Sequence, residues 1–368
     1  MMIHDLSTFN KSSDFYSPKA FLITVKSFDL QEIRTRYLKS RQSKSGRVGS
    51  VERRKAAQGG LVYVEIANGL ITKHEILSFL TEPRGVDVSK DILAVSTENV
   101  VHVIGHDVVE RIDNPWFSYI HTVQFNHRSD PDRILVSSSG YDCIFEYELG
   151  SFNQSWEWFA WEHGFQKGFN PRTGKEIVLT RNAKEASMLR KEGMEYMFIK
   201  DPEKQVLPTA QRAAFINSVV YDARKAGYLL ATFFHEGAVY SVNMKNGAHS
   251  KVLEGMKSPH GGRNFHDRYM ATSTATGELY FSDGEKITFK SLPGKPAALA
   301  ELEWLQNSAP FDDCLITIDA NRNSFVVIDP ENKLYDMISF DPNWAIQDIA
   351  ELRDPETKEL VKTIKEKL

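Results

Sequence analysis

The chain has 368 residues, with 45 basic and 49 acidic side chains and a formal charge of −4, so no strong overall field favours nucleic acid or an anionic membrane. Hydrophobic residues make up 41% and aromatic residues 11%, which excludes a disordered chain and supplies a large core. No stretch approaches the ~18 apolar residues of a spanning helix, and the N-terminus lacks a basic leader with an apolar core. We therefore expect a cytoplasmic protein with no membrane or nucleic-acid partner.

The first predicted hairpin pairs the strand that begins at Phe21 with one that begins at Gly60. Residues 34–58, between them, are basic and polar and form a loop insertion whose role the sequence does not indicate. Cys143 and Cys314 also fall in strand-like runs, in well separated parts of the predicted fold. We expect buried thiols there, with no disulfide between them.

A polar residue follows a short apolar stretch and opens a new strand six times along the chain. The separations are 37, 96, 43, 46 and 41 residues, and the long gap holds an insertion, so the repeat is roughly forty residues. This period predicts an all-β chain folded as a six-bladed β-propeller. Equivalent positions in its blades face the central channel. The predicted ring therefore consists of Arg84, His121, Asn217, His260, Gln306 and Gln347.

The insertion in the long gap covers residues 161–213 and contains a helical stretch, for which Asn182 is the predicted N-cap. Strand direction places the turn after each second strand, and each connection between blades, on the face of the channel that holds the ring. Both insertions are therefore predicted to cover that mouth, the second as a partly helical lid.

The end of the chain is predicted to close the propeller. The strand at Phe21 has no opening strand before it, and the opening strand at Ile346 has no second strand after it. We expect the C-terminal strand to join the first blade, which removes two exposed sheet edges. Residues 1–354 then form a single propeller domain. Residues 355–368, with Leu360, Ile364 and Leu368 at helical spacing, form a surface helix that packs on it.

The ring residues are compatible with three occupants of the channel. His121, His260 and Gln347 lie on alternate blades and offer two imidazoles and an amide to one divalent metal ion, such as zinc or calcium. Alternatively, Arg84 anchors an anion while His121 or His260 transfers protons near neutral pH. In the third case the ring lines a channel that holds only water.

Further candidates for substrate binding lie in turns and in the predicted lid around the mouth: Tyr141, Asp142, His163, His235, Glu236 and Arg322. Asn217, Gln306 and Gln347 are expected to position groups by hydrogen bonding. The chain has no GxxxxGK[ST], GxGxxG, GxSxG, HExxH or CxxC motif, so a nucleotide cofactor and standard serine hydrolysis are not expected.

Three short sequence motifs resemble the blades of NHL-repeat and gluconolactonase-like propellers. They are Glu82-Pro-Arg-Gly-Val-Asp-Val, Ser258-Pro-His-Gly-Gly-Arg and the turn that begins at Asp319. The resemblance extends from about Phe21 to Leu352 and implies the fold. Within that group, lactonases hold calcium with Glu, Asn and Asp, and amidating lyases hold zinc with histidines at strand starts. Asn217 is similar to the first pattern, and His121 with His260 to the second, but neither set is complete here.

We therefore expect an enzyme, a hydrolase or lyase, that acts on a small polar and anionic substrate at the covered channel. Metal-assisted and histidine-based hydrolysis or elimination both remain open. The alternative is a propeller without catalysis that binds a peptide or protein partner through its insertions. The same insertions offer contacts for a homo-oligomer.

Overall fold

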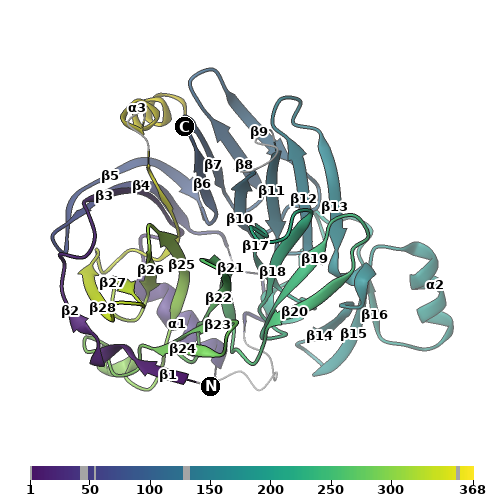
Figure 1. Ribbon diagram of the computed structural model, residues 1–368. Helices are drawn as coiled ribbons and strands as arrows, with labels where there is room; N and C mark the ends of the chain where they lie inside the picture. Colours follow the sequence, from purple (N-terminus) through teal and green to yellow (C-terminus); the bar gives the residue numbers. More distant parts are fainter. Residues whose placement is uncertain (1, 42–48, 54, 127–132, 354–356) are drawn as a thin grey trace.

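Most of the chain folds into small sheets of four or five strands (Figure 1). The computed structural model describes residues 2–41, 49–53, 55–126, 133–353 and 357–368. Within these ranges there are six such sheets and one of three strands. The arrangement is consistent with the all-β propeller that the sequence predicts.

Three of the sheets have four consecutive antiparallel strands each, because short polar turns join neighbouring runs of β-branched and aliphatic residues. The first contains β6 (Val86–Ser89), β7 (Ile92–Ser96), β8 (Val100–Ile104) and β9 (Val109–Asp113). The second contains β10 (Ile120–Phe125), β11 (Arg133–Ser138), β12 (Cys143–Glu148) and β13 (Gln154–Phe159). The third contains β17 (Ile216–Tyr221), β18 (Tyr228–Phe233), β19 (Ala238–Asn243) and β20 (His249–Leu253).

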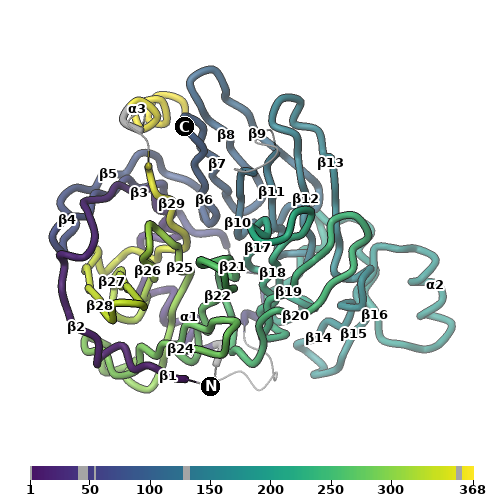
Figure 2. The backbone as a smooth tube through the Cα atoms, viewed as in Figure 1, coloured from purple at the N-terminus to yellow at the C-terminus, as the bar shows by residue number. Residues whose placement is uncertain are grey.

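Two further sheets have the same antiparallel core and gain a fifth, parallel strand from the N-terminal segment, which the sequence did not lead us to expect (Figure 2). One contains β21 (Pro259–Phe265), β22 (Arg268–Ser273), β23 (Glu278–Phe281) and β24 (Glu285–Thr288), with β1 (Met2–Asp5) beside β24. The other contains β25 (Leu305–Phe311), β26 (Cys314–Asp319), β27 (Ser324–Asp329) and β28 (Leu334–Ser339), with β2 (Asn10–Lys11) beside β28. The 3-10 turn η1 (Leu6–Thr8) joins β1 to β2.

The sixth sheet joins the two ends of the chain. Its order is β29 (Ile346–Glu351), β3 (Lys19–Val25), β4 (Gln58–Ala67) and β5 (Leu70–Thr81), so the C-terminal strand pairs with the first long strand, as the sequence predicts. The first strands of the six sheets, β6, β10, β17, β21, β25 and β29, contact one another in a closed circle.

Neighbouring sheets are held together by apolar clusters and by side chains that bond to the next backbone. Leu135 of β11, for example, belongs to one buried cluster with Leu229 of β18. Near the circle, Val86 N donates to the Asp348 carboxylate at 3.3 Å, and Val219 N donates to Thr122 Oγ1 at 3.0 Å. Part of the backbone of β6 and of β17 is therefore satisfied by a side chain of the neighbouring sheet.

The first insertion forms a helix in the β3 to β4 connection, α1 (Leu30–Arg41), which begins four residues before the predicted loop. Leu30 and Ile33 of α1 are buried with Trp304, Ala320 and Ala345. Arg34 donates to the carbonyls of Ala320 and Asn321 at 2.7 and 2.9 Å. These contacts fix the start of the helix. Residues 42–48 and 54 of this insertion lie outside the described residues.

The second insertion differs from its prediction as a lid. It contains η2 (Ala160–His163), the three-stranded sheet of β14 (Lys167–Asn170), β15 (Lys175–Thr180) and β16 (Tyr196–Phe198), α2 (Ala183–Lys191) and η3 (Thr209–Gln211). Figure 1 shows this sheet and α2 at the periphery. The strands of the insertion pair with one another, so its backbone is satisfied there. Asn182 caps α2 as predicted, accepting from Lys184 N at 2.9 Å.

The remaining helical elements are η4 (Ala297–Leu299) and α3 (Thr357–Lys367). Leu360 and Ile364 of α3 are buried against residues of β4, β5 and β7, including Leu61, Leu77 and Leu93. Cys143 and Cys314 are both buried free thiols. Over the described part of the chain, no helix combines the length and the apolarity that crossing a membrane requires.

Candidate functional site

Five of the six predicted ring residues are the second residue of an inner strand and lie in or beside a break in strand register, whereas Arg84 lies two residues before β6. His121, Asn217 and Gln347 each fall in a one-residue shift of the ladder, between Ile120 and Thr122 in the first case. Wider shifts follow His260 and surround Gln306. A bulge re-aims a side chain relative to its sheet, so these irregularities turn ring residues away from the regular pleat.

The imidazole of His121 is fixed by two groups on its Nδ1 side. Nδ1 lies 3.0 Å from the Tyr119 carbonyl and 2.8 Å from Ser139 Oγ, whose own proton is donated to the Ile216 carbonyl. Because both partners act as acceptors, Nδ1 carries the proton and Nε2 carries the lone pair. Nε2 accepts from Arg84 Nη1 at 3.1 Å.

His260 repeats this arrangement in another sheet. Its Nδ1 lies 3.2 Å from the Ser258 carbonyl and 2.7 Å from Thr274 Oγ1. In both histidines the carbonyl belongs to the residue two positions earlier, and that residue has a positive φ, 51° at Tyr119 and 55° at Ser258. Nε2 of His260 has no hydrogen bond to a described residue, so its lone pair is available to a ligand.

Both imidazoles are uncharged near neutral pH. Burial lowers the pKa of His260 to about 3, with a further contribution from the Lys26 charge. Burial and the adjacent Arg84 guanidinium hold the pKa of His121 well below its usual value. Neutral imidazoles accept hydrogen bonds and do not repel the nearby cations.

Arg84 is a buried cation with one buried carboxylate partner. Its Nη2 pairs with Glu82, and both side chains are almost fully excluded from solvent. Its Nε has no hydrogen-bond partner among the described residues. Burial lowers the pKa of Arg84 to about 10.

The amide members of the ring divide into two groups. Gln347 accepts from Lys26 Nζ at 3.2 Å and donates to Gln306 Oε1 at 3.4 Å, so these residues form a chain of polar contacts. Asn217 instead donates to the Pro259 carbonyl at 2.7 Å and is 1% exposed. It does not line the cavity described next, and its contact joins two inner strands.

The other five ring residues open into one cavity of about 430 Å³, which is within the usual range for small-molecule sites. Helix α1 and residues 49–52 also line it. The charged part of its lining is mostly cationic. One described carboxylate, Glu52, lines the cavity together with five basic side chains, Lys26, Arg36, Lys39, Arg84 and Arg212. The cavity therefore favours an anionic ligand.

The cavity contains an arginine that the sequence analysis missed. Arg212 is fully buried, and its guanidinium lies 4.2 Å from the Tyr119 ring centroid and 4.9 Å from that of Phe215. Burial lowers the pKa of Arg212 to about 10. An arginine in the apolar run Ala-Gln-Arg-Ala-Ala-Phe just before a strand is a signal that could have identified it.

Tyr141 and Asp142 do not line the cavity. The Tyr141 hydroxyl donates to the Pro202 carbonyl, and its ring packs on Trp116 and Trp161. Asp142 is fully buried, and its carboxylate accepts from the backbone N–H groups of Ala213, Ala214 and Phe215 at 2.9, 3.1 and 2.5 Å. This carboxylate therefore fixes the segment that carries Arg212 and Phe215 to the cavity.

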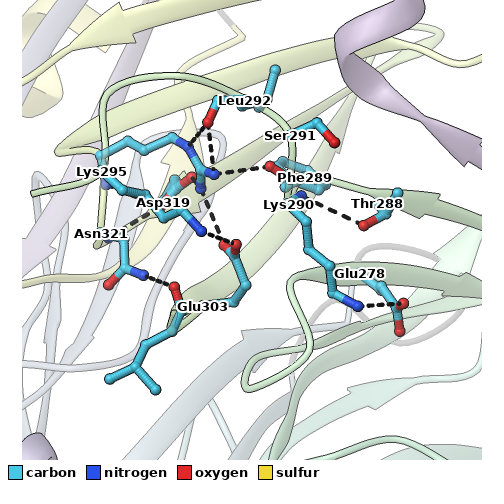
Figure 3. A network of polar contacts seen from close by, with 12 residues as sticks. Glu278, Thr288, Phe289, Lys290, Ser291, Leu292, Lys295, Glu303, Asp319 and Asn321 are labelled. Atoms are coloured by element: carbon cyan, nitrogen blue, oxygen red, sulfur yellow. Dashed lines mark hydrogen bonds and ion pairs between the residues drawn. The ribbon is translucent and has the colours of Figure 1, made fainter. Parts of the chain in front are cut away.

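Arg322 does not line the cavity and belongs to a buried ionic cluster with Asp319 and Glu303, which Figure 3 labels. Its guanidinium contacts Asp319 at 2.7 Å and Glu303 at 3.1 Å, and it donates to the Phe289 and Leu292 carbonyls. Lys295 adds a second cation to Glu303 at 2.7 Å. With its donors used in this way, Arg322 joins two sheets.

The three remaining candidates are not part of the cavity lining. His235 contacts two lining residues, with its Nε2 3.1 Å from the Thr209 carbonyl and its ring beside Phe215. Glu236 is an exposed turn residue. His163 stacks on Trp158 at 4.9 Å, next to the peripheral insertion. The sequence predicts that His163 reaches the mouth from the second insertion, and His235 and Glu236 from a turn of the fourth blade, but none of the three lines the cavity.

The predicted metal donors fit a divalent cation poorly. His121 Nε2 already accepts from Arg84, and the Gln347 oxygen already accepts from Lys26. A metal ion would have to displace Arg84 from His121 and Lys26 from Gln347. Of the three predicted donors, His260 alone has no such cation bound in the part of the chain that the structure describes. Among the described residues, no group of three or more His, Cys, Asp or Glu side chains is placed to hold a metal ion.

Comparisons with known proteins bear on the fold alone. No family model and no curated protein matches the chain. A chain of a nidogen/laminin complex is similar over 90% of this chain and 98% of its own, at 9% identity and a TM-score of 0.51. A protein of unknown function from Bacteroides caccae is similar over 92% of this chain and 100% of its own, at 13% identity and a TM-score of 0.52. Streptogramin B lyase, a propeller, covers 70% of this chain and 83% of its own, at 8% identity and a TM-score of 0.42.

Proposed function

We propose that the chain is a six-bladed β-propeller whose blades resemble those of NHL-repeat and gluconolactonase-like proteins. The closed circle of contacts among the six inner strands supports this count. In this interpretation β29 is the innermost strand of the blade that β3, β4 and β5 complete. The three-stranded sheet of the second insertion then lies outside the ring of blades.

We propose further that the cavity is the active site of a hydrolase or lyase that acts on a small organic anion. The observation that carries this proposal is the convergence of Arg84, Arg212 and Lys26 on a cavity whose two histidines are neutral. A bound anion would stabilise these buried cations through charge-assisted hydrogen bonds. Arg84 and Lys26 would hold the charged group of the substrate, and Arg212 would add to the positive potential of the cavity.

His260 is the proposed acid–base residue, because its unprotonated Nε2 borders the cavity and its Nδ1 is fixed by Ser258 and Thr274. A bound anion would raise the pKa of His260 toward the range in which proton transfer is effective. In an elimination Nε2 would accept a proton from carbon beside the anionic group, and the leaving group would depart with its bonding pair. In a hydrolysis the proton would come from water. In both cases Arg84 and Lys26 would stabilise the developing negative charge.

A second candidate function is binding of a peptide or protein partner, or of a second copy, through the peripheral insertion. The observation that favours it is the exposure of two methionines on and after α2, Met188 at 53% and Met194 at 48%. Exposed methionines are common on adaptable binding surfaces. This surface is separate from the cavity, so the two functions can be tested independently.

The experiment that tests the enzymatic proposal compares H260Q with H106Q, a substitution of an exposed histidine outside the site. Purified proteins are incubated with a panel of phosphate esters, sulfate esters, lactones and substituted carboxylates, and product formation is followed by mass spectrometry. We expect turnover of one class by the wild type and by H106Q, with a loss of at least a hundredfold in H260Q. Equal turnover by H260Q would refute the role of His260.

A further inference from the structure

The cavity has an aromatic side that the proposed proton transfer does not use. Tyr37 of α1 stacks on Trp304, with ring centroids 4.6 Å apart and planes 19° apart. Both rings line the cavity. The Lys26 ammonium lies 5.9 Å from the Trp304 centroid and 3.2 Å from Gln347 Oε1. A positive charge therefore adjoins an aromatic pair that forms one side of the cavity.

Further rings border the same space. Phe234 meets the His260 imidazole edge to face at a centroid distance of 5.7 Å, and Phe215 meets His121 in the same way at 5.4 Å. Tyr119 is the remaining lining aromatic, beside Arg212. Each cationic or imidazole group at the inner end of the cavity is thus close to an aromatic ring.

This juxtaposition is poorly suited to a small anion that is polar throughout. Inorganic phosphate would satisfy the cations but would leave the parts of Trp304 and Phe234 that line this cavity of about 430 Å³ without an apolar partner. A ligand with a planar apolar body would stack on the rings, which adds to the favourable burial of its own surface.

We propose that the ligand is an aryl-borne anion, a carboxylate or phosphate attached to an aromatic ring, with the anionic group at Arg84 and Lys26 and the ring against Trp304. This inference rests on the proposed function, since it assigns the substrate class of the same cavity. The short path from Lys26 to Trp304 suits an anionic group one or two bonds from the ring. Trp304 and Tyr37 then determine specificity for the body of the ligand, and Arg84 determines affinity for its charge.

The test uses ligands that differ only in the ring. Calorimetric titration compares phenyl phosphate with inorganic phosphate, and benzoate with acetate, so that the two pairs also distinguish phosphate from carboxylate. Cyclohexanecarboxylate has a similar volume without a π-face. We expect at least one aryl anion to bind about tenfold or more tightly than its ring-free partner, and to bind several-fold more tightly than its saturated analogue.

The variants separate the two ends of the cavity. W304L is expected to reduce the aryl preference to less than threefold while leaving the affinity for the ring-free anion unchanged. Because Trp304 also packs on Leu30 and Ile33, Y37L serves as a second variant that removes the stacking partner from the half-buried helix surface. F79L, in which a ring 62% exposed on β5 is changed, is the control and should keep the full preference.

The outcomes distinguish this inference from the proposal beneath it. Equal affinity for phenyl phosphate and phosphate, and for benzoate and acetate, would overturn the aryl assignment while leaving an anion site in place. An aryl preference that persists in both W304L and Y37L would overturn the assignment of the ring to this side of the cavity. No binding of any of these anions would overturn both proposals together.

Discussion

Removing the Arg84 charge is expected to have separate effects on stability and on anion binding. Arg84 and Glu82 are a buried ion pair, with side chains 4% and 1% exposed. R84Q leaves the Glu82 carboxylate buried without this cation, and such a change typically costs about 3–5 kcal/mol of unfolding free energy. E82Q/R84Q removes both charges and is expected to recover all but about 1–2 kcal/mol of that loss.

The affinity for the anion should depend on whether Arg84 is present and not on how stable each variant is. A charge-assisted hydrogen bond contributes about 1.5–3 kcal/mol, so both R84Q and E82Q/R84Q should bind the best ligand of the anion titrations about 10- to 100-fold more weakly. E82Q is the matched control. It keeps the cation, removes a competing carboxylate and should bind the anion at least as tightly as the wild type.

The assays are urea unfolding followed by tryptophan fluorescence and calorimetric titration with that ligand. If R84Q unfolds at the same urea concentration as the wild type, the buried pair does not have the assigned energetic role. If E82Q/R84Q binds the anion with wild-type affinity, Arg84 is not the anchor, and the proposed orientation of the substrate is wrong.

Three other predictions follow from the same contacts. The folded-state pKa of His260 is depressed to about 3, so its contribution to stability is present above the unfolded-state value near 6.5 and is lost as the pH falls. About 2 kcal/mol should disappear between pH 7 and pH 5, and H260Q should reduce this difference in urea titrations at the two pH values. D142N replaces an acceptor of three backbone N–H groups and should lower the unfolding free energy by about 3 kcal/mol, whereas D201N, at an exposed carboxylate, should leave it nearly unchanged. Because Arg84 and Lys26 occupy two predicted metal donors, treatment with EDTA should leave the melting temperature unchanged, and a drop of several degrees together with stoichiometric zinc or calcium by elemental analysis would contradict this account.

The strand repeat and the location of the candidate site could be predicted because a similar short sequence motif occurs at the start of each inner strand. The apolar run and the polar residue after it place Arg84, His121, His260, Gln306 and Gln347 around one cavity. The closing pair of β29 and β3 was also predictable, since each strand lacked a partner in its own part of the sequence.

Other parts of the candidate site depend on tertiary contacts that no local sequence motif predicts. Lys26 directly follows β3, and Trp304 lies two residues before Gln306. Their convergence requires the packing of α1 onto the β25 sheet. Asn217 shares the position of the other ring residues, yet its amide turns to the Pro259 carbonyl. A repeat predicts equivalent backbone positions and leaves the hydrogen-bond partner of each side chain undetermined.

The second insertion shows a related limit. Strand direction indicated where the connection between β13 and β17 should run, and Thr209 and Arg212 at its end do reach the cavity. Residues 167–198 instead pair with one another in β14, β15 and β16. Sequence signals showed that this segment is ordered, but not that it satisfies its own backbone away from the mouth.

The most direct test of the anion site is a crystal structure of the protein grown with tungstate, a phosphate analogue that is located by its anomalous scattering. The account predicts an anomalous peak inside the cavity, within hydrogen-bond distance of the Arg84 guanidinium and on the side of the cavity bordered by His260. Peaks confined to surface lysines, with the cavity lacking any, would contradict it.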